Sequence, residues 1–433
     1  MISRNLSKYK LAELFFLIAI LFLCSSLTLS GLLLLPTLIY GSIIQARKKS
    51  YFKNLWQCSF LICGILIIIN ALLQRFIIPN PFQDIWDPNL SIIGTANWIP
   101  LFWIFWACQP YLDSPAKRKK FSIALVAGSL PLILTGFAQY FLDWTGPFQT
   151  LNGLIIWYQR PIIDGLTGLF NNQNYTGSWF NLVLPFSIAF IFEKSNDFLR
   201  KSVSLCFLLS IGFSIFLTSS RNAWTGMLFA LPLLLGKKRI IFIIVGLALF
   251  IFLIFPIISG ALEGNIIDII PKFIVDQFSR KSPSGLESTR LDLVKSAIGI
   301  IKTSPIIGVG AGSFTSIYQL ETNFYRGHSH NLFTELAVSY GVPVTLIFAF
   351  TIFSIIIISY QKIFLKKKTT KDINFFERAF WVAVFFFFIS QLADIQYFEG
   401  RISILVWILL ASLKNIIEES KSKEQITYKK INM

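Results

Sequence analysis

The sequence predicts an all-α polytopic membrane protein, and three observations carry that prediction. Hydrophobic residues make up 54% of the 433-residue chain, and the mean hydropathy is +0.64. Charged residues make up only 14%, against about 25% in soluble domains. Apolar runs of roughly 18 or more residues recur, each long enough to cross about 30 Å of hydrocarbon. Because lipid offers the backbone no hydrogen-bond partners, these runs are expected to be helices.

Reading the apolar runs in order predicts about 12 transmembrane helices. The N-terminal run has no small-residue cleavage site after it, so it is expected to stay as the first span. The second run follows so closely that the pair is expected to form a tight hairpin. The predicted spans are residues 11–27, 28–45, 55–74, 97–113, 121–143, 174–192, 202–219, 222–236, 240–259, 331–360, 379–394 and 402–417.

Lys and Arg are distributed unevenly between the segments that join these spans. If the N-terminus is cytoplasmic, 28 of the 39 Lys and Arg residues lie in inner segments. This bias follows the positive-inside rule and predicts that both termini are cytoplasmic. The chain then divides into an N-terminal transmembrane bundle of about nine spans (1–259), a large periplasmic loop with amphipathic helices (260–330), and C-terminal spans with a cytoplasmic tail (331–433).

The same charge distribution narrows the possible partners. The net charge of +17 is mostly this inner basic belt, which is attracted to the anionic headgroups of membrane lipids and implies no nucleic acid. All five cysteines lie inside apolar runs, which disfavours a disulfide framework and shows no metal-ligand spacing. They are Cys24, Cys58, Cys63, Cys108 and Cys206.

Two stretches of the outer loop are expected to be helical. Residues 265–278 form a short amphipathic stretch that suits the membrane interface. Residues 288–305 predict a helix, because Ser288 or Thr289 can cap its start and Pro305 lies just past its end.

Arg290 leads the second of these helices. A period of 3.6 residues places it on the same face as Val294 and Ala297, which predicts that it heads the buried face. A buried arginine needs a partner. Arg290 is therefore expected either to form a structural salt bridge with an acid such as Glu287 or Glu321, or to hold an anion.

The glycine-rich stretch "GVGAGSF" (308–314) allows two interpretations. Its G-x-G-x-G spacing resembles a phosphate loop, but it follows a Pro-terminated helix and no Lys-Ser/Thr comes after it. A turn that lets the backbone pack closely is the better interpretation.

Four further arginines lie at the outer edges of spans, namely Arg160, Arg221, Arg326 and Arg401. An arginine near a span end often does no more than reach the lipid headgroups. Several of them near a histidine pair, with few competing carboxylates, favour a phosphate or pyrophosphate ligand, because the guanidinium fork binds such groups with two parallel hydrogen bonds.

Both histidines of the chain lie in "FYRGHSHNLFTE" (324–335). Two ligands with one residue between them make no metal site without further donors, and no cysteine or acidic cluster accompanies them. A plain loop histidine and a general base remain. The base is favoured, since neutral imidazole accepts a hydroxyl proton near neutral pH. His330 is the first candidate, with Asn331 placed to orient its ring, and His328 is the second.

Together these motifs resemble the O-antigen ligase and O-antigen polymerase superfamily of bacterial membrane glycosyltransferases. Residues 290–350 resemble its arginine-led helix, its P-x-x-G-x-G-x-G turn and its H-x-H-N pair. "GLFNNQNYTGSWFNLVLPF" (168–186) resembles its Gly-Phe-Asn-Pro-Asn segment, with Gln173 in place of the proline and Asn174 retained. "SSRNAW", which contains Arg221, resembles its Ser-Arg turn.

The resemblance implies a GT-C-like fold in the bacterial inner membrane, with the active site facing the periplasm. The donor would be an undecaprenyl-diphosphate-linked glycan, and the acceptor a glycan, a lipid core (as in lipopolysaccharide) or a protein. It implies no cofactor and no divalent metal, and an inverting transfer. His330 would be the base, while Arg221 and Arg290 would hold the pyrophosphate. The full expected site comprises His330 and His328 as catalytic residues, and Arg160, Arg221, Arg290, Arg401, Asn174 and Asn331 as substrate-binding residues.

Two other classes of function fit a polytopic membrane protein. An anion transporter of the inorganic carbon (bicarbonate) type is the main alternative, but transporters carry ionisable groups near the bilayer midplane. The predicted spans hold almost none there. A structural scaffold would not need arginines and histidines concentrated at one face. Whether the enzyme is a ligase, a polymerase or a protein O-oligosaccharyltransferase stays open.

Overall fold

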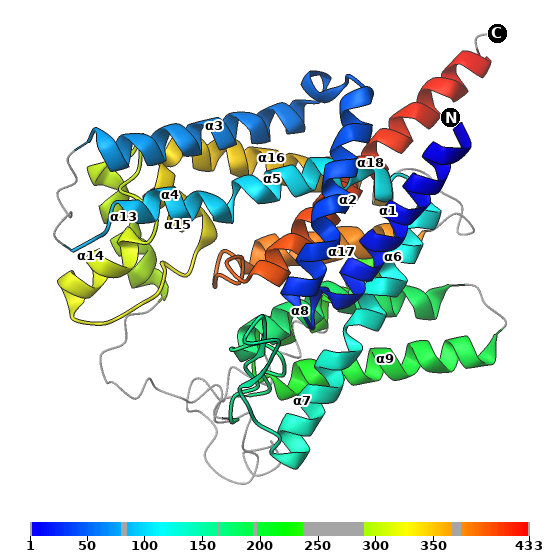
Figure 1. The fold of residues 1–433 in the computed structure, drawn as a ribbon, viewed down its shortest axis with the longest axis horizontal. Coiled ribbons are helices and arrows are strands. Elements are labelled where there is room, and N and C mark those ends of the chain that lie inside the picture. Colours follow the sequence, from blue (N-terminus) through cyan, green and yellow to red (C-terminus); the bar gives the residue numbers. More distant parts are fainter. Residues whose placement is uncertain are drawn as a thin grey trace.

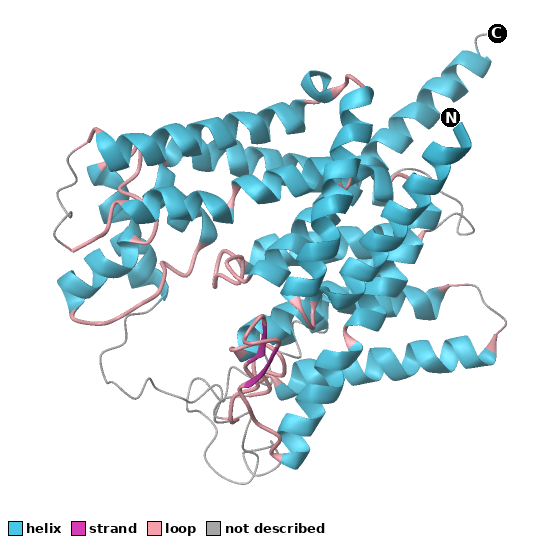
Figure 2. Cartoon of the chain, viewed as in Figure 1, coloured by secondary structure: helices cyan, strands magenta, loops and turns pink. Residues whose placement is uncertain are grey.

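The computed structural model describes residues 2–78, 85–162, 165–193, 197–236, 290–365 and 374–431. Most of these residues are helical, with one short strand pair among them (Figure 2). The predicted span 240–259 and the predicted amphipathic stretch 265–278 lie outside the described residues.

Figure 1 shows how the helices are arranged in the described parts of the chain. Strand β1 (Phe148–Thr150) pairs antiparallel with β2 (Ile155–Trp157). The α-helices are α1 (Ile2–Leu23), α2 (Leu27–Arg47), α3 (Leu55–Phe76), α4 (Asn89–Gly94), α5 (Ile99–Ala107), α6 (Pro115–Gly128), α7 (Leu130–Leu142), α8 (Gln173–Phe192), α9 (Phe198–Leu217), α10 (Arg221–Leu235), α13 (Arg290–Thr303), α14 (Ser313–Thr322), α15 (Leu332–Tyr340), α16 (Val342–Tyr360), α17 (Phe375–Ser390) and α18 (Gly400–Ile431).

Eight segments of the described chain are long and apolar enough to cross a membrane. This confirms an integral membrane protein built from helices. Helices α10 and α17 match two further predicted spans, but their 15 and 16 residues fall short of the roughly 20 that a span needs. Twelve spans therefore stays a prediction. The eight are Leu27–Arg47, Leu55–Phe76, Asn89–Ala107, Pro115–Leu142, Gln173–Phe192, Phe198–Leu217, Val342–Leu365 and Gly400–Ser420.

Aromatic side chains fix α18 in the centre of the bundle. Trp407 is fully buried, and its ring meets those of Phe60, Phe102 and Phe105 at centroid distances between 4.9 and 6.1 Å. The tilt between these rings suits the aromatic quadrupole, and each such pair adds about 0.5–1.5 kcal/mol beyond area burial. Because α18 is held by α3 and α5, the loop that leads into it has a fixed end.

Helix α8 crosses α10 at close range. A Cβ at Gly177 would lie 2.5 Å from the Cβ of Ala223, and a Cβ at Gly226 would lie 2.2 Å from the amide nitrogen of Asn181. Glycine therefore lets the two helices approach where a side chain would separate them. The starts of α8 and α10 consequently lie side by side.

Helices α13, α14 and α15 form a small outer unit with its own apolar core (Figure 1). The predicted helix at 288–305 is observed as α13, at 290–303. The predicted single span 331–360 is instead two helices, since α15 ends at Gly341, whose φ is +90°. A Cβ at Gly341 would lie 2.0 Å from the carbonyl oxygen of Ile306, so the chain bends where another backbone crosses it.

The glycine-rich turn 308–314 packs against other backbone and aromatic groups, as the close-packing interpretation predicted. The Val309 N–H donates to the carbonyl of Val338 over 2.7 Å. Gly310 has a φ of +136°, and a Cβ there would lie 2.1 Å from the buried ring of Trp86. The turn joins the outer unit to the bundle and leaves its glycines no room for a phosphate.

We expect Gly310→Ala to lower the free energy of unfolding by about 1–3 kcal/mol from backbone strain alone, with the clash against Trp86 adding to that loss. Gly299→Ala is the matched control, because Gly299 lies inside α13 and a Cβ added there would have no atom within 4 Å. Alanine there should be neutral or stabilising. Thermal unfolding in detergent measures both, and equal melting temperatures would contradict this packing.

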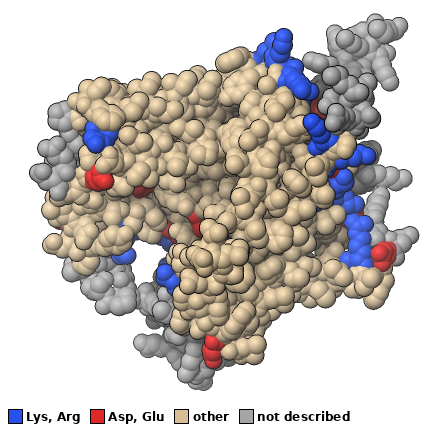
Figure 3. All heavy atoms as spheres, in the orientation of Figure 1, with Lys and Arg blue, Asp and Glu red and all other residues tan. Residues whose placement is uncertain are grey.

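The two ends of the molecule differ in their content of basic residues. Both termini lie at one end (Figure 1), and Figure 3 shows Lys and Arg atoms along that same edge. Helices α13–α15 lie at the opposite end, as expected if the basic end is the inner one. The basic residues include Lys48, Lys49 and Lys53 after α2, Lys117, Lys119 and Lys120 in α6, and Arg200 and Lys201 in α9.

Candidate active site

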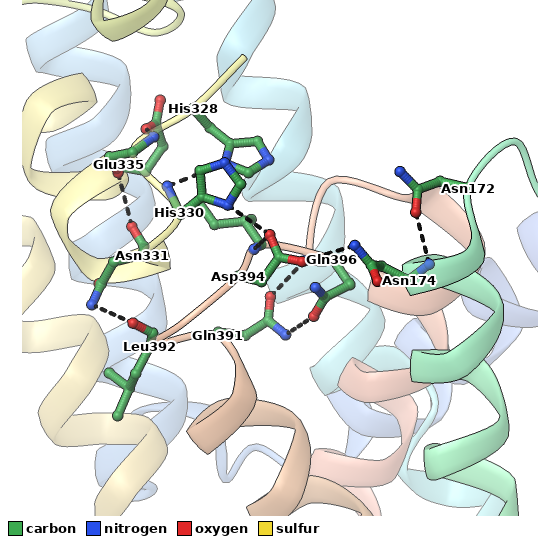
Figure 4. A network of polar contacts seen from close by, with 12 residues as sticks. Asn172, Asn174, His328, His330, Asn331, Glu335, Gln391, Leu392, Asp394 and Gln396 are labelled. Carbon is green, nitrogen blue, oxygen red and sulfur yellow. Dashed lines mark hydrogen bonds and ion pairs between the residues drawn. The ribbon is translucent and has the colours of Figure 1, made fainter. Parts of the chain in front are cut away.

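Three segments far apart in sequence meet in one polar network (Figure 4). The first is the loop 324–331, which carries both histidines and leads into α15. The second is the loop 391–399 between α17 and α18. The third is the start of α8, with Asn172 and Asn174. The close-up shows side chains of all three pointing toward Asp394 or its neighbours.

His330 and Asp394 form the centre of this site. The Nδ1 of His330 lies 2.8 Å from the Oδ1 of Asp394. The imidazole side chain is 27% exposed and the carboxylate 8%, so the histidine is the more accessible partner. His330 has a φ of +57°, a left-handed conformation uncommon for a residue with a side chain, and such strain often marks functional positions. The carboxylate accepts a hydrogen bond from Nδ1–H, which leaves the lone pair of Nε2 free to accept a proton.

Asp394 is held as an anion by several donors. Its Oδ1 also accepts the Ile395 N–H at 3.1 Å, and its Oδ2 accepts from the amide of Asn174 at 3.3 Å. Burial raises the pKa of Asp394, but the hydrogen bond and charge of His330, with Arg290 and His328 adding, bring that pKa below its usual value. The carboxylate thus stays charged at neutral pH.

Asn331 has a different role from the one predicted. Its Oδ1 caps α15 by accepting from the N–H groups of Phe333 and Thr334 at 3.0 and 3.2 Å, and its Nδ2 donates to the carbonyl of Leu392. The expectation that Asn331 orients the His330 ring is therefore wrong, since an N-cap side chain points back at its own helix. Asp394 orients the ring instead.

Buried polar side chains fix both loops. Ser329 is fully buried, and its N–H donates to Glu335 at 2.9 Å. Gln391, also fully buried, accepts from the N–H groups of Gln396 and Tyr397. The Leu332 N–H donates to the Gln391 carbonyl at 3.0 Å, which ties one loop to the other. Such networks of buried hydrogen bonds hold the backbone of both loops in place.

His328 contacts His330 but not in the same way as Asp394 does. Its Nδ1 accepts the backbone N–H of His330 at 3.2 Å. The two rings meet edge to face with centroids 4.4 Å apart. Burial lowers the pKa of His328 to about 4, with the charge of His330 adding and that of Asp394 opposing. His328 is therefore neutral near pH 7.

His328, His330 and Asp394 also have the composition of a small metal site. One ligating atom of each lies within 4.8 Å of the others. However, the His330 Nδ1 and the Asp394 oxygen are 2.8 Å apart, whereas two ligands of a tetrahedral zinc with bonds of about 2.0–2.1 Å lie roughly 3.3 Å apart. The observed spacing is that of a hydrogen bond.

The two arginines expected to bind pyrophosphate are each the first residue of a helix, Arg290 of α13 and Arg221 of α10. Arg290 is exposed, although it shares its helical register with the buried Leu293 and Ala297. The expectation that it lies buried is wrong, because it is the first residue of α13 and the core begins one turn later. Its charge reaches Asp394, whose pKa it helps to lower. Between Arg290 and Glu321, both described, the structure shows no ion pair, and Glu287 lies outside the described residues.

Arg221 is exposed at the first position of α10. Ser220 caps this helix by accepting the Ala223 N–H. Because α10 crosses α8 closely at Gly177, Arg221 stands beside the helix end that carries Asn174.

The other predicted arginines differ in their surroundings. Arg401 is tied into the fold: its Nε donates to Glu399 at 2.7 Å, its Nη1 donates to the carbonyls of Cys24 and Leu169, and it lies 3.8 Å from the Phe170 ring centroid. Arg160 is exposed next to the strand pair. Arg326 is half-buried, and its Nε has no hydrogen-bond partner among the described residues.

Comparison with known protein families finds a match that includes both histidines of this cluster. Residues 205–349 match the family model described as O-antigen ligase. The chain carries an O-antigen ligase domain. The resemblance to the O-antigen ligase and polymerase superfamily is thereby confirmed. A search of curated proteins finds no match.

The O-antigen ligase domain supports glycosyltransferase activity of the ligase or polymerase type and gives no support to the transporter alternative. It contains Arg221, Arg290 and both histidines. Asn174 and Asp394 lie outside the matched residues, yet the fold brings them to His330. Asp394 is the residue that sequence reasoning missed.

Proposed function

We propose that this protein is a metal-independent, inverting glycosyltransferase of the bacterial inner membrane. It moves a glycan from an undecaprenyl-diphosphate-linked donor to an acceptor hydroxyl at the periplasmic face. The observation that carries the proposal is the His330–Asp394 pair, with its 2.8 Å hydrogen bond, inside a chain that has an O-antigen ligase domain.

In the proposed reaction the acceptor hydroxyl gives its proton to the Nε2 of His330. The resulting oxygen attacks the anomeric carbon, and the bond from that carbon to the diphosphate oxygen breaks. Lipid diphosphate leaves with the bonding electrons. One displacement inverts the configuration at the anomeric carbon. Asp394 stabilises the imidazolium that forms and keeps its ring in place, as a buried carboxylate does for other catalytic histidines.

Arg221 and Arg290 supply positive charge for the leaving diphosphate. Both side chains are exposed, and Arg290 is within electrostatic reach of Asp394. Guanidinium groups aimed at a leaving diphosphate stabilise the charge that develops in the transition state. Arg401 contributes by positioning instead, because two of its nitrogens are engaged with Glu399 and backbone carbonyls.

We expect Arg290→Ala and Arg221→Ala each to lower transfer by roughly 10²-fold or more, the usual loss for one such donor. The test is complementation of a strain that lacks the gene, with surface glycan analysed on gels and lipid-linked donor quantified. Arg75→Ala is the matched control, since Arg75 is an outer arginine whose Nε donates to Asn89. Normal glycan from both variants would rule out the proposed diphosphate site.

The same gels separate the acceptor classes. Glycan missing from the lipid core while donor accumulates indicates a ligase. A ladder that collapses to a single repeat unit indicates a polymerase. Loss of glycan from a protein, with both of those intact, indicates an O-oligosaccharyltransferase.

A further inference from the structure

The two histidines have opposite hydrogen-bonding states. His330 points its Nδ1 at the Asp394 carboxylate, which accepts only, so the His330 proton is on Nδ1 and Nε2 is an acceptor. His328 receives the backbone N–H of His330 at its Nδ1. That nitrogen must therefore carry the lone pair, and a neutral His328 carries its proton on Nε2.

We propose that His328 is a hydrogen-bond donor to the acceptor substrate and not a second base. Its Nε2–H donates to an oxygen next to the hydroxyl that His330 deprotonates. The chemistry this pair recognises is a sugar with two neighbouring oxygens, one giving a proton and one accepting a hydrogen bond, as in a vicinal diol. This inference rests on the proposed function and adds a determinant of acceptor specificity to it.

The geometry of the two rings supports a shared substrate. Their centroids are 4.4 Å apart and the rings are tilted by 61°, so a single sugar ring can contact both imidazoles. His328 is half-buried, with its loop held by Ser329 and Glu335, and its position is therefore fixed before a substrate arrives.

The surroundings of His328 keep it neutral while His330 accepts the proton of the acceptor hydroxyl. Burial lowers the pKa of His328 to about 4. His330 and Asp394 act electrostatically on His328. Arg290 acts on Asp394, and Glu335 interacts with the charge of His330. When His330 takes the acceptor proton it becomes cationic, which opposes a second positive charge on His328. His328 thus cannot remove the proton that the reaction needs, but it retains its Nε2–H throughout.

Two substitutions separate the possible roles of His328. His328→Asn can place its Oδ1 where Nδ1 was and still accept the His330 N–H, but it has no donor at the Nε2 position. His328→Gln can place its amide N–H near the Nε2 position, but it offers no acceptor close to the His330 N–H. If His328 has a purely structural role, His328→Asn keeps the activity. If His328 is a donor to the substrate, His328→Gln keeps it.

The assay uses the purified full chain in lipid, with lipid-linked glycan and acceptor extracted from source cells that lack the gene. We expect His328→Gln to keep kcat/KM within a few fold and His328→Asn to lose about tenfold or more, one lost substrate hydrogen bond being worth that much. The pH dependence of kcat/KM should be the same in both variants and the unmodified protein, because a donor that does not titrate adds no limb to the profile.

Several results would overturn this role. Equal activity of His328→Asn and His328→Gln would contradict it, and so would a higher activity of His328→Asn. A limb of the pH profile that disappears when His328 is replaced would contradict it as well. His330→Gln, run alongside, tests the proposed function by itself. If that variant keeps its activity, the base assignment has failed. If it is inactive while the His328 variants are equal, only the inference about His328 has failed.

Discussion

His330→Gln is expected to lower glycan transfer by about 10³-fold or more, the upper part of the range for loss of a general base. Glutamine keeps the length and polarity of the side chain but its amide nitrogen cannot accept a proton. The acceptor hydroxyl would then attack without deprotonation. Lipid-linked donor should accumulate and mature glycan should disappear, which gels and quantified donor both measure.

This variant should otherwise resemble the unmodified protein. His330 is not part of the packed core, and its ring makes one side-chain hydrogen bond, to Asp394. The melting temperature is therefore expected to change little, and Arg221 and Arg290 should still bind the donor. A normal glycan ladder from His330→Gln at equal protein level would show that another group is the base.

Asp394→Asn is expected to lower transfer by roughly 10²–10⁴-fold while leaving the shape of the site intact. An asparagine in this position can donate its amide N–H to the His330 Nδ1, which moves the histidine proton to Nε2. The nitrogen that should accept the acceptor's proton would then be blocked. The equivalent Asp→Asn change in serine proteases costs about 10⁴-fold for the same reason.

Glu399→Gln is the matched control for Asp394→Asn. It removes a carboxylate from the same loop, but Glu399 holds Arg401 and the Ile402 N–H. Glu399→Gln should lower the transfer rate less than Asp394→Asn does, and it should lower the melting temperature more. Equal losses of transfer from the two variants would show that the charge of the loop matters and not the contact with His330.

Local sequence patterns predicted the residues that lie within a single motif. The pair "HSHN" directed attention to His330, which the structure pairs with Asp394, and the stretch before Pro305 predicted the helix observed as α13. The glycine turn was predicted to pack closely because no lysine or strand accompanied it, and Gly310 against Trp86 confirms this. Such features depend on neighbours a few residues away, which a sequence displays directly.

Asp394 could not be found in this way because it lies 64 residues from His330, on a different loop. One signal was available. Between Glu377 and Glu399 it is the sole acid, at the end of the apolar run "FWVAVFFFFISQLAD". An ionisable group at the edge of such a run is costly and commonly functional. Asn331 was instead chosen as the orienting residue because it is adjacent, but adjacency along the chain does not give the direction of a side chain.

The most direct test uses the fact that the chain has only two histidines. Solid-state ¹⁵N NMR of protein labelled only at histidine, in lipid, reports which nitrogen of each imidazole carries a proton. His328→Gln leaves one imidazole, which assigns its nitrogen signals to His330. We predict that this ring carries its proton on Nδ1, and that Asp394→Asn moves the proton to Nε2. A proton on Nε2 of His330 in the unmodified protein would contradict its role as the base held by Asp394.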